Sequence, residues 1–125
     1  MIAIGALGKM YADGESIALE GEKGNCMYIV QQGTVAVVTG QGDREVLLST
    51  LGPGDVFGEM SLFTGAARSA TVRAKGSARV LTIDKRGFLK RVHEDPSLAF
   101  QVLRKMSERI HELNQEVARL RREQV

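Results

Sequence analysis

Short hydrophobic runs alternate with glycine-containing turns from residue 7 to residue 83. Turn signals recur about every 8–12 residues, a spacing typical of antiparallel rolls, barrels and sandwiches. The segment Gly40–Asp43 is expected to join two strands as a hairpin, because its glycines tolerate the positive φ that such turns require. The predicted strands are Cys26–Val30, Thr34–Val38, Glu45–Leu48, Ala70–Ala74 and Ala78–Ile83, after a first strand that begins near Leu7 or Gly8.

After Ile83, glycine nearly disappears and helix-forming residues dominate. Asp84 is expected to cap a short helix that runs to about Val92, because its carboxylate can accept from free N–H groups of the first turn. Asp95 and Pro96 predict the start of a long C-terminal helix, as its cap and its first helical position. The predicted fold class is therefore α+β. It comprises an antiparallel β-roll (double-stranded β-helix, jelly-roll-like) over about residues 7–83 and helices over about residues 85–125, within one domain of residues 1–125.

The long helix carries a hydrophobic stripe, spaced alternately four and three residues apart. It consists of Ala99, Leu103, Met106, Ile110, Leu113, Val117 and Leu120. Branched residues at the a positions and leucine at d favour a parallel two-stranded coiled coil. A homodimer through this stripe is the favoured interpretation, because the stripe continues for three turns beyond residue 110. The alternative is that the stripe packs the helix onto its own roll.

Composition and charge exclude several classes of protein. The chain has 125 residues, of which 43% are hydrophobic and 26% charged, as in an ordinary soluble domain. Its net charge of +2 is too small to indicate nucleic-acid binding. No apolar run approaches the ~20 residues of a membrane span, and no signal peptide is recognisable. The single Cys26 excludes an internal disulfide and fits a reducing compartment, so the expected location is the cytoplasm.

The segment from Gly52 to Val72 holds the most informative chemistry. Gly58 precedes a short predicted helix, whose first N–H groups and dipole favour an anion. Arg68 can hold a phosphate through bidentate, charge-assisted hydrogen bonds, while Glu59 can accept from a sugar hydroxyl. A cyclic nucleotide presents both groups side by side. From the residues alone, a structural ion pair between Glu59 and Arg68 is an equally good interpretation.

This segment resembles the phosphate-binding cassette of cyclic-nucleotide-binding domains. The family includes the catabolite activator protein, regulatory subunits of protein kinase A and cyclic-nucleotide-gated channels. The resemblance begins at Tyr11–Ile17, continues through Glu20–Val35 and is densest in residues 57–72. It implies a β-roll that binds cyclic AMP or cyclic GMP, with no cofactor besides this ligand. Both nucleotides fit the pattern.

The resemblance also implies roles for individual residues. Glu59 would accept from the ribose 2′-hydroxyl, and Arg68 would bind the exocyclic phosphate oxygens. The helping groups would be the Ser69 hydroxyl and backbone N–H groups near Gly58, Met60 and Ser61. For Ser61, a hydroxyl used only within its own turn is an open alternative.

In the same family the purine base lies under the C-terminal helix. The corresponding region here contains Arg109, Leu113 and Asn114. An amide such as that of Asn114 can both donate to and accept from a purine edge. A solvated position on a coiled coil is the alternative for this residue.

The function that follows is a non-enzymatic regulatory module, in which ligand binding moves the C-terminal helix. The alternative is a ligand-free β-roll scaffold that only dimerises. A metalloenzyme of the related double-stranded β-helix type is rejected, and no metal site is expected, because His93 and His111 both lie in the helical region. No helix-turn-helix follows the long helix, so this chain alone is not expected to bind nucleic acid. The chain is either a stand-alone sensor or a fragment of a larger regulator.

Overall fold

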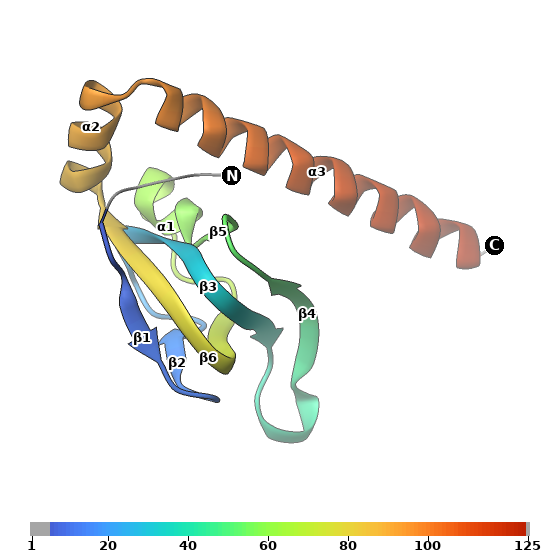
Figure 1. Ribbon diagram of the computed structural model, residues 1–125. Coiled ribbons are helices and arrows are strands. Elements are labelled where there is room, and N and C mark those ends of the chain that lie inside the picture. Colours follow the sequence, from blue (N-terminus) through green and yellow to red (C-terminus); the bar gives the residue numbers. More distant parts are fainter. Residues whose placement is uncertain (1–5, 125) are drawn as a thin grey trace.

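The computed structural model describes residues 6–124 and consists of an antiparallel β-roll followed by two helices (Figure 1). The expected α+β, jelly-roll-like fold is confirmed. The strands are β1 (Lys9–Tyr11), β2 (Ser16–Ala18), β3 (Cys26–Thr39), β4 (Val46–Leu51), β5 (Val56–Phe57) and β6 (Thr71–Asp84). The helices are η1 (Gly42–Arg44), α1 (Glu59–Thr64), α2 (Lys85–Glu94) and α3 (Ser97–Glu123).

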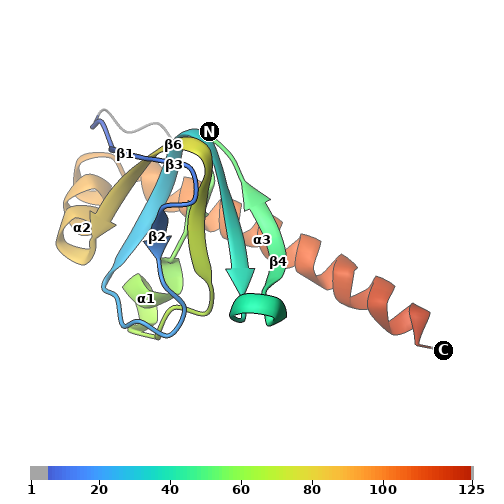
Figure 2. The same ribbon diagram turned by 90° about the horizontal axis from the view of Figure 1, so that it is seen from below.

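Two long antiparallel strands, β3 and β6, form the axis of the roll. Their pairing runs from Cys26 opposite Asp84 to Val38 opposite Thr71. Strands β1 and β2 pair with β6, whereas β4 and β5 pair with β3. The short strands are therefore added on either side of one long pair, which curves into the roll seen in Figure 2.

The sequence-based strand boundaries were wrong within β3 and β6. Four separate strands were expected there, with turns at Gly33 and Gly76, but each pair forms one strand of 14 residues. Both glycines have a positive φ, of 81° and 76°, and the register of the pair shifts near Gly33. A bulge accommodates an extra residue and bends a strand without ending it. These glycines therefore shape the roll without interrupting its strands.

The buried side chains form two clusters. One fills the roll itself and consists of Ala18, Val30, Val35, Phe57, Val72, Ala74, Ala78 and Val80. The other joins the roll to all three α-helices and consists of Met27, Ile29, Val56, Leu62, Leu81, Ile83, Phe88, Leu98 and Val102. Phe57 and Val56 are adjacent in β5 but belong to different clusters, because neighbouring residues of a strand point to opposite faces. The segment just before α1 is thus anchored on both sides.

Helices α2 and α3 begin close to their predicted positions. The Asp84 carboxylate accepts from the Gly87 N–H at 2.6 Å, which confirms it as the cap of α2. Asp95 accepts from the Ser97 N–H at 3.1 Å, and α3 begins at Ser97, one residue later than expected. Helix α2 continues two residues beyond the expected end at Val92. No helix within residues 6–124 is long and apolar enough to cross a membrane.

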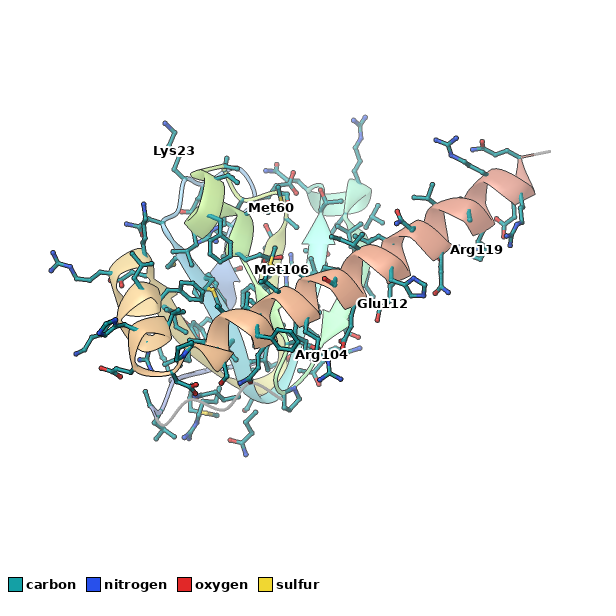
Figure 3. All side chains as sticks on the ribbon, turned by 90° about the horizontal axis from the view of Figure 1, so that it is seen from above. Lys23, Met60, Arg104, Met106, Glu112 and Arg119 are labelled. Atoms are coloured by element: carbon teal, nitrogen blue, oxygen red, sulfur yellow. The ribbon has the colours of Figure 1, made fainter. Side chains whose placement is uncertain are left out.

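Helix α3 contacts the roll through a stripe that shares Met106 with the predicted heptad but otherwise lies beside it. Leu98 and Val102 are buried, and Met106 packs against the same cluster. Five of the seven heptad residues are exposed, namely Leu103, Ile110, Leu113, Val117 and Leu120. The alternative in which the heptad stripe covers its own roll is therefore wrong for most of its length. The C-terminal part of α3 extends beyond the roll, and Arg119 lies on that part (Figures 1 and 3).

The two bulge glycines allow a test of this account. Gly33→Ala should destabilise the fold more than Gly76→Ala, although both positions have a positive φ. A Cβ at Gly33 would lie 2.2 Å from the Ser77 carbonyl oxygen, whereas at Gly76 it would meet nothing within 4 Å. The left-handed conformation alone costs roughly 1–2 kcal/mol. Overpacking at Gly33 should add about 1–3 kcal/mol, measured by urea unfolding. Equal losses would contradict the bulge geometry.

Candidate ligand-binding site

The site is built around the turn that joins β5 to α1. Gly58 precedes α1 with a φ of 75°, a left-handed conformation that favours glycine. Glu59 follows as the first helical residue and is only 7% exposed. Because the first N–H groups of a helix have no intrahelical acceptor, this turn presents donors as well as the Glu59 carboxylate.

Arg68 reaches this turn from the loop between α1 and β6. Its backbone N–H donates to the Glu22 carbonyl, and its own carbonyl accepts from the Gly21 N–H, both at 2.8 Å. The side chain is only 8% exposed. The loop is thus held against residues 21–22, and the guanidinium is directed inward.

Three groups surround the Arg68 guanidinium. Nη1 donates to the Gly58 carbonyl oxygen at 2.9 Å, and Nη2 donates to the Cys26 sulfur at 3.2 Å. The central carbon lies 5.2 Å from the centroid of the Tyr28 ring, which stacks in turn on Phe57. These contacts orient the guanidinium, but none of them neutralises its charge.

The expected alternative of an ion pair between Glu59 and Arg68 is wrong. Within residues 6–124, no carboxylate oxygen lies within 4 Å of an Arg68 nitrogen, and Glu59 pairs with Arg109 instead. Burying a charge without a counter-charge is costly. The site is therefore chemically suited to an anion, which would restore the balance of charge.

Two glycines make room for this guanidinium. A Cβ at Gly24 would lie 2.4 Å from Nη2, and one at Gly58 would lie 2.4 Å from Nη1. Real Cβ atoms essentially never come that close. Gly24 and Gly58 therefore form a cradle on either side of the fork, and any larger residue would displace it.

Glu59 is connected to helix α3. Its Oε1 atom accepts from Arg109 Nη1 at 2.9 Å, and Arg109 Nη2 also donates to the Val56 carbonyl oxygen. One turn earlier on α3, Lys105 pairs with Asp55 at 3.3 Å. Two cations on one face of α3 thus hold the helix to residues 55–59.

Tyr28 has an unusual electrostatic environment. Burial, followed by the neighbouring Cys26 thiol, raises the pKa of Tyr28 to about 12, although the Arg68 charge acts in the opposite direction. The phenol therefore stays neutral at ordinary pH. It offers the guanidinium an aromatic face and no counter-charge.

The remaining cassette residues are placed differently from one another. Ser61 is buried, and its hydroxyl donates to the Ala66 carbonyl at 2.8 Å, as in the alternative interpretation of this residue. Met60 is 59% exposed and lies on the outer surface of α1 (Figure 3). Ser69 is exposed and has no hydrogen-bond partner for its hydroxyl within residues 6–124. Its hydroxyl remains available to a ligand.

The three residues expected near a base are separated along α3. Arg109 reaches Glu59, as just described. Leu113 is 57% exposed, and Asn114 is also exposed. Neither of them makes a side-chain hydrogen bond within the described residues. Their expected contact with a ligand remains a prediction.

Sequence reasoning missed three residues around Arg68, namely Gly24, Cys26 and Tyr28. The spacing of Cys26 and Tyr28 in β3 was an available signal, because residues i and i+2 of a strand lie on the same face, whereas Gly24 precedes the strand. What the sequence does not reveal is that a loop 40 residues later folds over this face. In addition, no group of three or more His, Cys, Asp or Glu side chains in residues 6–124 is arranged to hold a metal ion.

Sequence and structure comparisons find known proteins that this chain resembles. The chain matches the family model described as cyclic nucleotide-binding domain over residues 9–95. A CRP-like cAMP-activated global transcriptional regulator of Mycobacterium tuberculosis is 31% identical over 124 residues, which cover 94% of this chain and 55% of that protein. The cAMP-dependent protein kinase type II regulatory subunit of Drosophila melanogaster is 38% identical over 88 residues, covering 70% of this chain and 23% of that protein.

The fold also matches a solved structure. The crystal structure of the catabolite activator protein of Thermus thermophilus superposes with a TM-score of 0.77 at 31% identity, covering 90% of this chain and 53% of that chain. The chain spans about half the length of the bacterial relatives it matches.

The raised pKa of Tyr28 predicts how stability changes at alkaline pH. Between about pH 10 and 12 the unfolded chain loses the phenol proton while the native state keeps it. The unfolded state then binds fewer protons, so the free energy of unfolding falls as pH rises. This contribution should be fully present below about pH 10 and be lost through about pH 12.

Denaturant unfolding at a series of pH values, from below pH 10 upwards, would measure this loss. Tyr28→Phe should show a shallower alkaline fall in stability than the wild-type chain. Identical slopes for Tyr28→Phe and wild type would refute the assignment.

Proposed function

Because the chain belongs to the cyclic nucleotide-binding domain family, we propose that it is a non-enzymatic regulatory module that binds cyclic AMP or cyclic GMP. The observation that carries this proposal is the buried Arg68 guanidinium, which has no carboxylate within 4 Å in residues 6–124. A cyclic phosphate is an anion of the right size for its fork. The roll binds the ligand, and ligand binding changes the position of α3.

In this proposal Arg68 binds the exocyclic phosphate oxygens. Its Nη1 atom is already engaged by the Gly58 carbonyl, whereas Nη2 meets only the Cys26 sulfur, a weak acceptor. A phosphate oxygen would be a much stronger partner for Nη2. The exposed Ser69 hydroxyl and the N–H groups at the start of α1, near Gly58, Met60 and Ser61, supply further donors.

Glu59 accepts from the ribose 2′-hydroxyl and connects the ligand to α3. This carboxylate already holds Arg109 at 2.9 Å. A ribose hydroxyl at the same oxygens would share or displace that guanidinium. Ligand and helix are coupled to the extent that Arg109 is held differently with and without nucleotide.

The base is expected near α3, where Leu113 and Asn114 would contact it. Both are exposed in this structure, beyond the last ion pair between α3 and the roll. They would reach the base through a movement of α3, or from the α3 of a second copy. Either way, ligand binding and the position of α3 would be linked.

The exposed heptad stripe supports a homodimer through α3. Ile110, Leu113 and Val117 are 58%, 57% and 48% exposed. Branched a positions and leucine at d suit a parallel pair of helices. The expected partners are therefore a cyclic purine nucleotide and a second copy of the chain, in the cytoplasm.

A ligand-free scaffold is the second candidate, and the exposed stripe alone would suit it. A scaffold function does not explain why Gly24 and Gly58 leave room for a buried Arg68 guanidinium that has no counter-ion. Isothermal titration of the chain with cyclic AMP and cyclic GMP separates the two candidates. Binding at micromolar affinity or tighter, about 8 kcal/mol, with clear preference over the linear 5′-monophosphates, supports the sensor. No heat with either cyclic nucleotide at millimolar concentration supports the scaffold.

Removal of Arg68 tests where the phosphate binds. Arg68→Ala should fold, because it removes a cation that has no carboxylate partner, and should weaken nucleotide binding by about 2–5 kcal/mol, ~30-fold or more. Arg68→Lys should restore only part of the nucleotide affinity, because an ammonium group does not reproduce the bidentate hydrogen bonds of a guanidinium. The matched control is Arg73→Ala, which removes a half-exposed arginine paired with Glu45. Isothermal titration of all three variants measures the effect. Unchanged affinity in Arg68→Ala would place the phosphate elsewhere.

Charged substitutions in the heptad stripe test the homodimer. Ile110→Asp combined with Val117→Asp places charges in the exposed seam and should produce monomers in analytical ultracentrifugation. His111→Asp combined with Gln115→Asp adds the same residues outside the seam and should leave the dimer intact. Saturating nucleotide should tighten the wild-type dimer by the same free energy that dimerisation adds to nucleotide binding. A wild-type chain that stays monomeric at high concentration, with and without nucleotide, would refute the dimer.

A further inference from the structure

The Arg68 site contains a thiol to which no role has been given so far. Cys26 is the first residue of β3, is partly exposed, and is the single cysteine of the sequence. Its Sγ atom lies 3.2 Å from Arg68 Nη2, the nitrogen that would meet the phosphate. Thiol chemistry and anion binding would therefore take place on adjacent atoms.

The same buried cation that supports the proposed function suits an anionic ligand beside this sulfur. The Arg68 side chain is more than nine-tenths buried, and within residues 6–124 no carboxylate lies within 4 Å of it. Its Nη1 has the Gly58 carbonyl as acceptor, whereas Nη2 has only the Cys26 sulfur, a weak acceptor. The least satisfied end of the buried cation thus points at Sγ.

The Sγ and Nη2 atoms are 3.2 Å apart, so groups bound to the two atoms would lie directly side by side. Even a single carbon at Gly24 would lie 2.4 Å from Nη2. A group attached to Sγ would, at a separation of 3.2 Å, compete with a phosphate oxygen for the position beside Nη2. A phosphate oxygen bound to Nη2 would, conversely, lie directly beside Sγ and cover it.

We propose that Cys26 is a site of reversible modification by low-molecular-weight disulfides, and that a mixed disulfide on Sγ and a cyclic phosphate on Arg68 exclude each other. The inference rests on the proposed function, because it assumes that the phosphate binds Arg68. It adds to that function a thiol-dependent control of ligand binding.

The chemical step is thiol–disulfide exchange. The Cys26 thiol gives its proton to solvent, and the thiolate attacks one sulfur of the small disulfide. A new S–S bond forms to Sγ while the original S–S bond breaks, and the other half leaves as a thiolate that takes up a proton. The small disulfide is the oxidant, so no further reactant is needed. Added dithiothreitol reverses the step.

The test uses the full chain with oxidised glutathione as the probe. Mass spectrometry follows the adduct on Cys26, whose assignment is unambiguous because the sequence has one cysteine. Cyclic nucleotide at ten times its dissociation constant should slow adduct formation about 10-fold, because only the unoccupied fraction reacts. The purified adduct should bind cyclic nucleotide at least 10-fold more weakly than the unmodified chain, and dithiothreitol should restore binding. Cys26→Ser should show the same affinity before and after exposure to oxidised glutathione.

Two results would overturn the proposal while the proposed function stands. One is that the adduct binds nucleotide as tightly as the unmodified chain. The other is that the native thiol does not react under conditions in which the urea-unfolded chain does. Failure of the unmodified chain itself to bind cyclic nucleotide, measured in the same titration, would instead refute the proposed function and this inference together.

Discussion

A buried guanidinium without a counter-charge is the constraint from which the site follows. Arg68 is oriented by a carbonyl, a thiol and an aromatic ring, and two glycines leave room for its fork. For folding alone this arrangement is unfavourable, because a buried cation loses its hydration without gaining an ion pair. An anion that enters the site offsets that loss. The arrangement therefore favours ligand binding at some expense of stability in the free protein.

One short turn connects this anion site to α3. The Gly58 carbonyl holds Arg68, and the next residue, Glu59, holds Arg109 of α3. Before Arg109 the helix is attached by the apolar Leu98 and Val102, and after it residues 110–124 are exposed except for the partly buried Ala118. The attachment thus changes from hydrophobic to ionic along the helix. In the proposed function a polar ligand would compete with the ionic part, and a small molecule in the roll would thereby act on α3.

Much of this fold could be predicted from sequence, because local signals and packing agree. The Asp84 cap and the change from strands to helices near residue 84 were predicted correctly, whereas the ligand-binding roles of residues 58–68 stay predictions. Gly33 and Gly76 were misread as turns, since a positive φ serves a bulge as well as a turn. Cys26, a partner of Arg68, and Arg109, the partner of Glu59, lie 42 and 50 residues away in sequence, and no local pattern specifies such pairs. The heptad pattern was visible in the sequence, but its exposure depends on which residues of α3 pack against the roll.

The central claim is that Arg68 binds the phosphate while Glu59 binds the ribose beside Arg109. A crystal structure of the chain with cyclic AMP or cyclic GMP tests it most directly. The account predicts an exocyclic phosphate oxygen at hydrogen-bond distance, about 2.7–3.0 Å, from the Arg68 guanidinium, and the ribose 2′-hydroxyl donating to Glu59. A nucleotide bound elsewhere, with Arg68 still contacting only Gly58, Cys26 and Tyr28, would contradict it.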